Sequence, residues 1–378
     1  MTKINIIGGN VAGLFTAIEL HKKYPSFEIT IYEQKKYWNK VCGGAFSYEF
    51  NDALEDLGIL LTEAHEVDNF IFGSWNKPLN VHKSPLLVGN RLDLQEALSC
   101  HVEGVLKIPI INKAVSSDDT DLFTPTTIVA TGASGFTRKT LRGTWGNKDA
   151  AMIVRFDDYI NNSHLKYPNT ALIAFDEEEV GYGWLFAGDN YHVNIGYGAV
   201  EMTNNQIWER FDKFITILNN VYGCKFTVED RRNIMKFAQG WQLPMPVKKN
   251  FHVSHGKAIS KRGTKFNDYI TFVGVGDALG MAHPILGAGI EPAWLSAKLL
   301  AKNMSYSGYV NIRQYQKDIQ HFARERITPS IDYHVCKFFR SSLYKHVPFK
   351  TKLINYLGGS HSRKIMKQFQ EQPMFNFE

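Results

Sequence analysis

The first 33 residues constrain the fold of this chain most strongly. A mostly apolar run, Ile4–Ile7, leads directly into a glycine-bearing turn, Gly8–Gly13, and apolar residues then recur at helical spacing over Leu14–Leu20. A second apolar run, Ile29–Tyr32, ends at Glu33. This order predicts a βαβ unit with a tight turn, a phosphate-binding helix N-terminus and a carboxylate for a ribose hydroxyl.

One position departs from the usual Gly-x-Gly-x-x-Gly pattern. Asn10 stands where a glycine normally lets the backbone approach a pyrophosphate. Asparagine tolerates unusual backbone angles better than most residues, and its amide can donate to a phosphate. We therefore predict a dinucleotide site in which Gly8, Asn10 and Gly13 form the turn and Glu33 binds the ribose.

A second glycine-bearing stretch follows a later apolar run. Tyr269–Val273 leads to Asp277, and a helical pattern starts directly after Gly287, Ala288 and Gly289. An aspartate at a strand end can accept from ribityl hydroxyls, and the helix N-terminus favours the negative charge of a reduced flavin. A Gly-Asp pair alone is as typical of an ordinary turn as of a flavin site. Together with the N-terminal turn it favours flavin over nicotinamide as the tightly held cofactor.

A cysteine and two glycines follow Glu33 closely. Gly43 and Gly44 allow a planar ligand to approach the backbone. Cys42 has two interpretations, a proton donor or a small packed side chain, and packing is the commoner role of a lone cysteine. The four cysteines of the chain are far apart and form no zinc-like cluster, so we predict no metal site.

An aromatic stripe marks the middle of the chain. Alternation along a strand puts Tyr182, Trp184 and Phe186 on one face, and a second strand returns over Asn194–Gly198. Such a stripe is more often core than cavity wall. Here glycines lie between the aromatic residues, which opens space on the opposite face of the sheet.

The nucleotide-type elements occur in three separated pieces, with strand-rich inserts between them. We predict an α/β fold (α+β overall) with a discontinuous Rossmann-like FAD domain, an antiparallel-sheet substrate domain and a helical, basic C-terminal segment. The predicted bounds are 1–66, 86–150 and 265–305 for the FAD-binding domain, 67–85 and 151–264 for the substrate domain, and 306–378 for the C-terminal segment.

The net charge of +6 is concentrated near the end of the chain. Residues 331–372 contain eight Lys and Arg against two acids, interleaved with aromatic residues. This composition suits an anionic surface, and without a nucleic-acid-binding signature we favour lipid over nucleic acid; the alternative is a solvated helical face. With no signal peptide and no apolar run of transmembrane length, we expect a cytoplasmic protein that this segment brings to the inner face of the membrane.

These motifs together resemble the FAD-dependent geranylgeranyl reductases of the para-hydroxybenzoate hydroxylase superfamily, over roughly residues 3 to 305. The resemblance rests on the motifs above and on three further segments: Arg91 with Leu92 and Asp93, Ala130 to Ser134 with Arg138, and Gly240 to Pro244. Besides Asn10, the chain departs from the family at Ala187-Gly188, which replace a Pro-Lys pair, and at Thr131, which replaces an aspartate.

The resemblance implies an enzyme that saturates C=C bonds of geranylgeranyl or polyprenyl lipids by hydride transfer from flavin N5. It implies that Arg91 contacts FAD, that Cys42 or a nearby water donates a proton, and that the prenyl chain is lined by Tyr182, Trp184, Phe186 and Pro284. The electron donor is NAD(P)H or ferredoxin, the latter a partner protein. Two alternatives stay open: a flavin monooxygenase or halogenase of the same superfamily, and a flavin-bound lipid carrier without turnover.

Overall fold

The computed structural model describes residues 1–35, 40–62, 64–76, 78–83, 86–141, 150–166, 168–176, 178–179, 181–188, 192–200, 202–244, 259–260, 269–282 and 288–322. These residues form two compact units. The first unit contains described residues from Met1–Asn39, Leu94–Ala150 and Leu243–Tyr333. The second unit contains described residues from Lys40–Asp93 and Ala151–Gln242. The chain therefore enters each unit more than once.

The first unit is built on a six-stranded sheet. Its strands are, in spatial order, β15 (Ile259–Ser260), β16 (Tyr269–Gly274), β9 (Thr126–Val129), β1 (Lys3–Ile7), β2 (Glu28–Glu33) and β8 (Ile110–Asn112). The pairs β16–β9, β9–β1, β1–β2 and β2–β8 are parallel, and β15 pairs antiparallel at the edge. The predicted Rossmann-like parallel sheet is confirmed.

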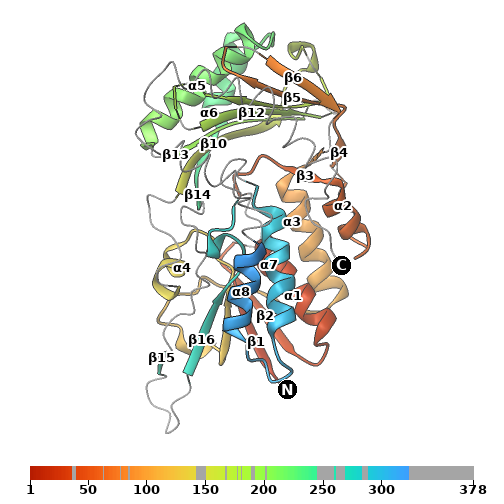
Figure 1. The fold of residues 1–378 in the computed structure, drawn as a ribbon, viewed down its shortest axis with the longest axis vertical. Coiled ribbons are helices and arrows are strands. Elements are labelled where there is room, and N and C mark those ends of the chain that lie inside the picture. The colour runs from red at the N-terminus through yellow and green to blue at the C-terminus, as the bar shows by residue number, and fades with distance from the viewer. Residues whose placement is uncertain are drawn as a thin grey trace. The chain divides into compact units, whose positions relative to one another are not determined.

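Helices cover both faces of this sheet. Helix α1 (Val11–Lys23) packs against α7 (Ile290–Asn303), and α8 (Ile312–Phe322) packs against α7 in turn (Figure 1). On the other face, Phe136 of α4 (Gly135–Thr140) packs against a cluster that includes Phe123 and Phe272. Helix α3 (Arg91–Cys100) begins in the second unit and ends in the first.

The second unit is built on a seven-stranded sheet. Its strands are, in spatial order, β14 (Gln239–Pro244), β10 (Ala150–Tyr159), β13 (His192–Val200), β12 (Gly181–Ala187), β11 (Thr170–Phe175), β5 (Asn69–Ser74) and β6 (Pro78–Lys83). The predicted hairpin is present as the antiparallel pair β12–β13. One pairing departs from the antiparallel expectation, since β5 and β11 run parallel.

One face of the seven-stranded sheet is covered by α5 (Asn204–Asn220) and α6 (Val228–Phe237) (Figure 1). A capping box of Thr203 and Gln206 starts α5, because each side chain satisfies an N–H group that the helix leaves unpaired. The buried face of α5 consists of Ile207, Phe211, Phe214, Ile215 and Leu218. These side chains pack on Leu185, Ile195 and Tyr197 of the sheet.

A small three-stranded sheet completes the second unit. It contains β3 (Ala45–Ser47), β7 (Leu86–Val88) and β4 (His65–Glu66), and α2 (Tyr48–Glu55) follows β3 directly. Short helical turns occupy His101–Val105, Thr120–Leu122, Asn162–His164 and Gly276–Leu279. None of the described helices is long and apolar enough to cross a bilayer. The predicted bounds of the FAD-binding domain, the substrate domain and the C-terminal segment stay a prediction.

Candidate active site

The glycine turn after β1 is closely packed in the first unit. Gly8 has φ +108°, and a Cβ there would lie 2.6 Å from the carbonyl carbon of Ala130. A Cβ on Gly13 would lie 1.8 Å from the carbonyl oxygen of Gly8. Both positions therefore require glycine, for different reasons: a left-handed backbone at Gly8 and close packing of α1 on the turn at Gly13. This is the geometry that a dinucleotide turn needs.

Glu33 ends β2 beside this turn. Its Oε2 accepts from the backbone N–H of Gly9 at 2.7 Å, and its Oε1 accepts from the N–H of Lys35 at 3.1 Å. The side chain is buried, with the residue 7% exposed. Because each carboxylate oxygen has more than one acceptor site, Glu33 can still accept from two ribose hydroxyls. The predicted ribose acid is therefore fixed next to the predicted phosphate turn.

Asn10 caps helix α1. Its Oδ1 accepts from the N–H of Val11 at 2.8 Å, and its Nδ2 donates to Oε1 of Gln95 at 3.1 Å. From the sequence we expected this amide to donate to a phosphate, whereas in the structure it donates to Gln95 of α3. Gln95 is 1% exposed, and its own Nε2 has no hydrogen-bond partner among the described residues. Sequence reasoning missed Gln95, although it follows Arg91 by one helical turn.

Two more glycine turns meet the first one in the same unit. Gly132 has φ +58°, and a Cβ there would lie 3.8 Å from Cβ of Asp277. Gly276 also has φ +58°, and a Cβ there would lie 2.7 Å from Cβ of Ala12. The N–H of Gly276 donates to Oγ of Ser296 at 2.8 Å, which ties this turn to α7. The carboxyl ends of β1, β9 and β16 therefore place Asp277 beside the dinucleotide turn.

The N-terminus of α7 is less simple than predicted. The helix starts at Ile290 with Gly289 as its N-cap, and Ala288 before it is exposed. Glu291 in the first turn is buried, so a carboxylate already occupies the helix end expected to attract negative charge. Gly287 and Pro284, which were predicted to contact cofactor and substrate, lie outside the described residues.

Thr131 belongs to a cluster of hydroxyl groups at the start of α4. Its Oγ1 accepts from Oγ of Ser134 at 2.8 Å and lies 2.8 Å from Oγ1 of Thr137. Ser134 is the N-cap of α4 and accepts from the N–H of Thr137 at 3.1 Å. The three hydroxyls thus stabilise the start of α4.

Cys42 belongs to the second unit and lies in a segment fixed at several points. Its Sγ accepts from the N–H of Gly44 at 3.4 Å. Gly44 has φ +70°, and a Cβ there would lie 2.3 Å from the carbonyl oxygen of Gly89. The N–H of Gly89 donates to the carbonyl of Gly44 at 2.8 Å. The Cys-Gly-Gly segment is therefore anchored to the end of β7, and Gly44 cannot carry a side chain without moving it.

The predicted aromatic stripe supports this segment from the sheet. A Cβ on Gly43 would lie 3.0 Å from Cε2 of Phe186 and 3.5 Å from Nε1 of Trp184. Trp184 covers Gly196 of the neighbouring strand, where a Cβ would lie 2.0 Å from the indole ring. Trp184 and Phe186 are only 4% and 6% exposed, so both rings pack under Gly43. Their role in lining a substrate channel stays a prediction.

Tyr182 is the member of the stripe that is only partly buried. Its ring centroid lies 5.9 Å from that of Trp184. Burial, with a smaller contribution from nearby Cys42, raises the pKa of the Tyr182 phenol above its usual range. Tyr182 is therefore a neutral hydrogen-bond donor near the thiol throughout the physiological pH range.

A buried polar network lies on the same face as the stripe. Nε1 of Trp184 donates to Oδ1 of Asn194 at 2.7 Å. Nδ2 of Asn194 and a terminal N–H group of Arg155 both donate to the carbonyl of Cys42, at 3.0 Å and 3.2 Å. Arg155 forms an ion pair with Asp157 at 3.1 Å. Sequence reasoning missed Arg155 and Asp157, because neither belongs to a recognisable motif.

Arg91 is the first residue of α3 and is buried in the second unit. Oδ1 of Asn90 accepts from the N–H of Leu92 at 2.8 Å, which caps the helix.

The predicted site residues form two groups. Gly8, Asn10, Gly13, Glu33 and Asp277 converge in the first unit, and Cys42, Gly43, Gly44, Trp184 and Phe186 converge in the second.

Solved structures share this fold. A geranylgeranyl bacteriochlorophyll reductase-like protein from Thermoplasma acidophilum has a TM-score of 0.63 at 14% identity, with 97% of this chain and 99% of that chain covered. A variant of HpxO from Klebsiella pneumoniae, complexed with FAD, has a TM-score of 0.62 at 12% identity, covering 99% and 100%. The sequence matches no protein-family model and no curated protein.

An oxygenase of known substrate has the same fold. The tetrameric form of 2-methyl-3-hydroxypyridine-5-carboxylic acid oxygenase has a TM-score of 0.61 at 18% identity, with 91% of this chain and 93% of that chain covered. At such identities the likeness establishes the fold and leaves the reaction to the residues of the site. The predicted resemblance is confirmed at the level of the fold.

Proposed function

We propose that this chain is an FAD-dependent oxidoreductase that saturates C=C bonds in geranylgeranyl or polyprenyl chains of lipids. The observation that carries the proposal is the placement of Cys42. Its thiol is near Tyr182 of the aromatic stripe, in a segment that hydrogen bonds hold against the sheet and against Gly89. An acid beside an apolar surface is what the addition of hydrogen to an unactivated alkene requires.

The first unit fits the adenosine half of FAD. Neither Gly8 nor Gly13 has room for a side chain, and Glu33 is held by Gly9 in a position to accept from a ribose. Asp277 ends β16 next to Gly132 and suits ribityl hydroxyls. The solved structure of the HpxO variant contains FAD on the same fold. We propose NAD(P)H or a ferredoxin-like protein as the electron donor.

When bound, reduced FAD would supply a hydride to one alkene carbon. The thiol of Cys42 holds the proton for the other carbon and regains one from water, so each double bond gains one H₂. The N–H of Gly44 donates to the sulfur and steadies the negative charge left on it. Tyr182 is a neutral phenol, whose pKa burial raises further, and it supplies another donor near the thiol.

A second candidate function is a flavin-dependent monooxygenase or halogenase. The likeness to 2-methyl-3-hydroxypyridine-5-carboxylic acid oxygenase supports it as well as the likeness to the reductase-like protein supports the first proposal. The two reactions differ in their use of oxygen, because a monooxygenase consumes it during turnover and an alkene reductase does not. A lipid carrier without turnover would perform neither reaction.

The deciding experiment starts from the absorption spectrum of the purified protein. A bound flavin is expected, and a colourless protein that takes up no added FAD would refute the proposal. The protein is then reduced with dithionite without oxygen and mixed with prenyl lipids. We expect mass spectrometry to detect a gain of one H₂ per reduced double bond. Substrate-stimulated oxygen consumption with a hydroxylated product would instead support the monooxygenase.

A further inference from the structure

We propose that Asn194 and Arg155 are positioning residues for Cys42, which they act on through its backbone carbonyl. The inference deepens the proposed function and rests on it for the role of the thiol. Both side chains come from the seven-stranded sheet of the second unit, and both donate to the same oxygen, at 3.0 Å and 3.2 Å. The carbonyl of Cys42 is thus held by two adjacent strands.

The register of the strands explains why two donors meet at one oxygen. Asn194 on β13 lies opposite Asp157 on β10, and Arg155 lies two residues from Asp157 and so points to the same face. On β12, Trp184 and Phe186 lie opposite Gly196 and Asn194 on that face. Glycine at 196 lets the indole lie flat and reach Asn194. The sheet therefore presents a built surface to the Cys42 segment.

The donors are themselves fixed by buried partners. Oδ1 of Asn194 accepts from Nε1 of Trp184 at 2.7 Å, so the amide is oriented with Nδ2 toward Cys42. Arg155 is 4% exposed and pairs with Asp157 at 3.1 Å. Nε2 of His192 lies 2.7 Å from the other oxygen of Asp157. The ion pair with Asp157 therefore holds Arg155 in place while its guanidinium donates to the carbonyl of Cys42.

Three contacts then determine the orientation of the thiol. The carbonyl of Cys42 is held by the sheet, its sulfur accepts from the N–H of Gly44, and Gly44 is held by Gly89. Rotation of the Cys42 peptide would break two hydrogen bonds to buried donors. The side chain keeps a partly exposed position in one orientation. Loss of either donor should release the segment without unfolding the sheet.

The experiment measures alkylation of cysteines by iodoacetamide in the full chain, by peptide mass spectrometry. Three cysteines serve as reporters. The alkylation rate of Cys42 measures how freely its segment moves. Exposed Cys100 shows the reactivity of the reagent with an accessible thiol, and buried Cys224 reports loss of structure in the second unit. Burial raises the pKa of Cys224 to about 12, so it stays unreactive while the unit is folded.

The main variant is Asn194→Asp, which keeps an acceptor for Trp184 and removes the donor to Cys42. We expect the alkylation rate of Cys42 to rise about fivefold, the effect of losing one hydrogen bond, while Cys100 and Cys224 keep their rates. Arg155→Met should do the same. Arg155→Lys keeps a cation beside Asp157 and a donor for the Cys42 carbonyl, and its Cys42 should be alkylated at the wild-type rate. Asp158→Asn, an exposed change on the same strand, is the matched control.

Two results would overturn the positioning role. One is an unchanged alkylation rate of Cys42 in Asn194→Asp and Arg155→Met. The other is a joint increase at Cys42 and Cys224 in both Asn194→Asp and Arg155→Lys, which would show a general structural role instead. For alkene reduction by Asn194→Asp and Arg155→Met, we expect kcat to fall about tenfold with KM nearly unchanged, because the proton is needed only in the transition state. If the protein reduces no alkene, the alkylation rates still decide the contact.

Discussion

At the scale of single residues, Cys42 differs from the other described cysteines in what surrounds it. Cys100 is exposed and Cys224 is buried in the hydrophobic core of the second unit, whereas Cys42 is partly exposed and bonded through both its sulfur and its carbonyl. A packed cysteine needs none of these polar contacts. The surroundings of Cys42 therefore favour a chemical role over a packing one.

We expect Cys42→Ser to keep bound flavin and to lose alkene reduction by roughly 100-fold, the usual contribution of a positioned general acid. A serine hydroxyl is similar in size, and it is a much weaker acid than a thiol. The measurement is the initial rate of lipid reduction under anaerobic conditions, with flavin absorbance as the control for binding. Cys100→Ser should react at the wild-type rate. Equal turnover in Cys42→Ser would remove this residue from the mechanism.

Gly13 offers a test of the dinucleotide turn. A Cβ at this position would lie 1.8 Å from the carbonyl oxygen of Gly8, so Gly13→Ala must push α1 away from the turn. We expect a loss of about 2 kcal/mol in the free energy of unfolding, together with loss of flavin from the purified protein. Urea denaturation and the absorbance spectrum measure the two effects. Gly104→Ala is the control, because a Cβ there meets no atom within 4 Å.

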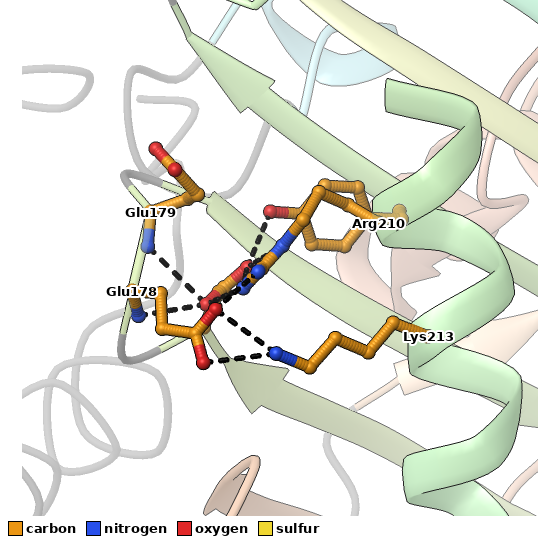
Figure 2. Close-up of polar contacts among 6 residues, drawn as sticks. Glu178, Glu179, Arg210 and Lys213 are labelled. Carbon is orange, nitrogen blue, oxygen red and sulfur yellow. Dashed lines mark hydrogen bonds and ion pairs between the residues drawn. The ribbon is translucent and has the colours of Figure 1, made fainter. Parts of the chain in front are cut away.

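At the scale of elements, α5 is tied to the turn between β11 and β12 by an ion cluster. Arg210 and Lys213 of α5 both reach Glu178, and Arg210 also binds buried Asp176 (Figure 2). The hydroxyl of Tyr197 donates to Asp176 at 2.7 Å. Because β12 carries the aromatic stripe, this cluster fixes the strand from the face opposite to Cys42.

The cluster predicts an acid-dependent loss of stability. Hydrogen bonds from Lys213 and then Arg210 lower the pKa of Glu178 from 4.5 to about 2. Because the pKa of Glu178 is lower in the folded state, its ionised carboxylate contributes its full stabilisation above pH 4.5. This contribution is lost as the pH falls toward 2. Its size is expected to be under about 1 kcal/mol, because the Glu178 side chain is 61% exposed.

Urea denaturation of Glu178→Gln between these pH values provides the test. The variant should be less stable than the wild type at neutral pH, and the difference should shrink as the pH falls. Glu179→Gln is the control, because the Glu179 carboxylate points away from Arg210 and Lys213 (Figure 2). A stability difference that is independent of pH in Glu178→Gln would contradict the assignment.

The sequence predicted the elements better than it predicted their contacts. Helix α7 spans Ile290–Asn303 as expected, and β1, α1 and β2 follow the predicted order, because long periodic patterns and glycine turns are local signals. The parallel pairing of β5 with β11 and the network of Arg155 were not predicted. Both depend on which strands become neighbours and in which direction they run, and a local pattern does not specify a partner strand that is far away in sequence.

At the scale of the whole molecule, the basic C-terminal segment, residues 331–372, lies outside the described residues, and its role at a membrane stays a proposal. Its eight Lys and Arg carry the excess charge of the chain, and each basic residue near an anionic bilayer contributes about 1 kcal/mol to binding. The charge is therefore sufficient for reversible attachment at low salt, which high salt would screen.

We expect the full chain to sediment with anionic phosphatidylglycerol vesicles at low salt and to be released at high salt. Replacing Lys350, Lys352, Arg363 and Lys364 by Gln should lower the partition coefficient by roughly 1000-fold. A control with the same net charge replaces four exposed lysines elsewhere, Lys22, Lys139, Lys236 and Lys317. Equal sedimentation of the two quadruple variants would show that the C-terminal segment has no special part in binding.

The repeated entry of the chain into both units has a consequence for how the protein is made. Strand β16 and helix α7, which complete the parallel sheet, leave the ribosome long after β1, α1 and β2. The N-terminal βαβ unit must therefore wait, with its apolar faces uncovered, until most of the second unit has been synthesised. Nascent chains of this protein should depend on chaperones over that interval, and a fragment released before β16 should aggregate.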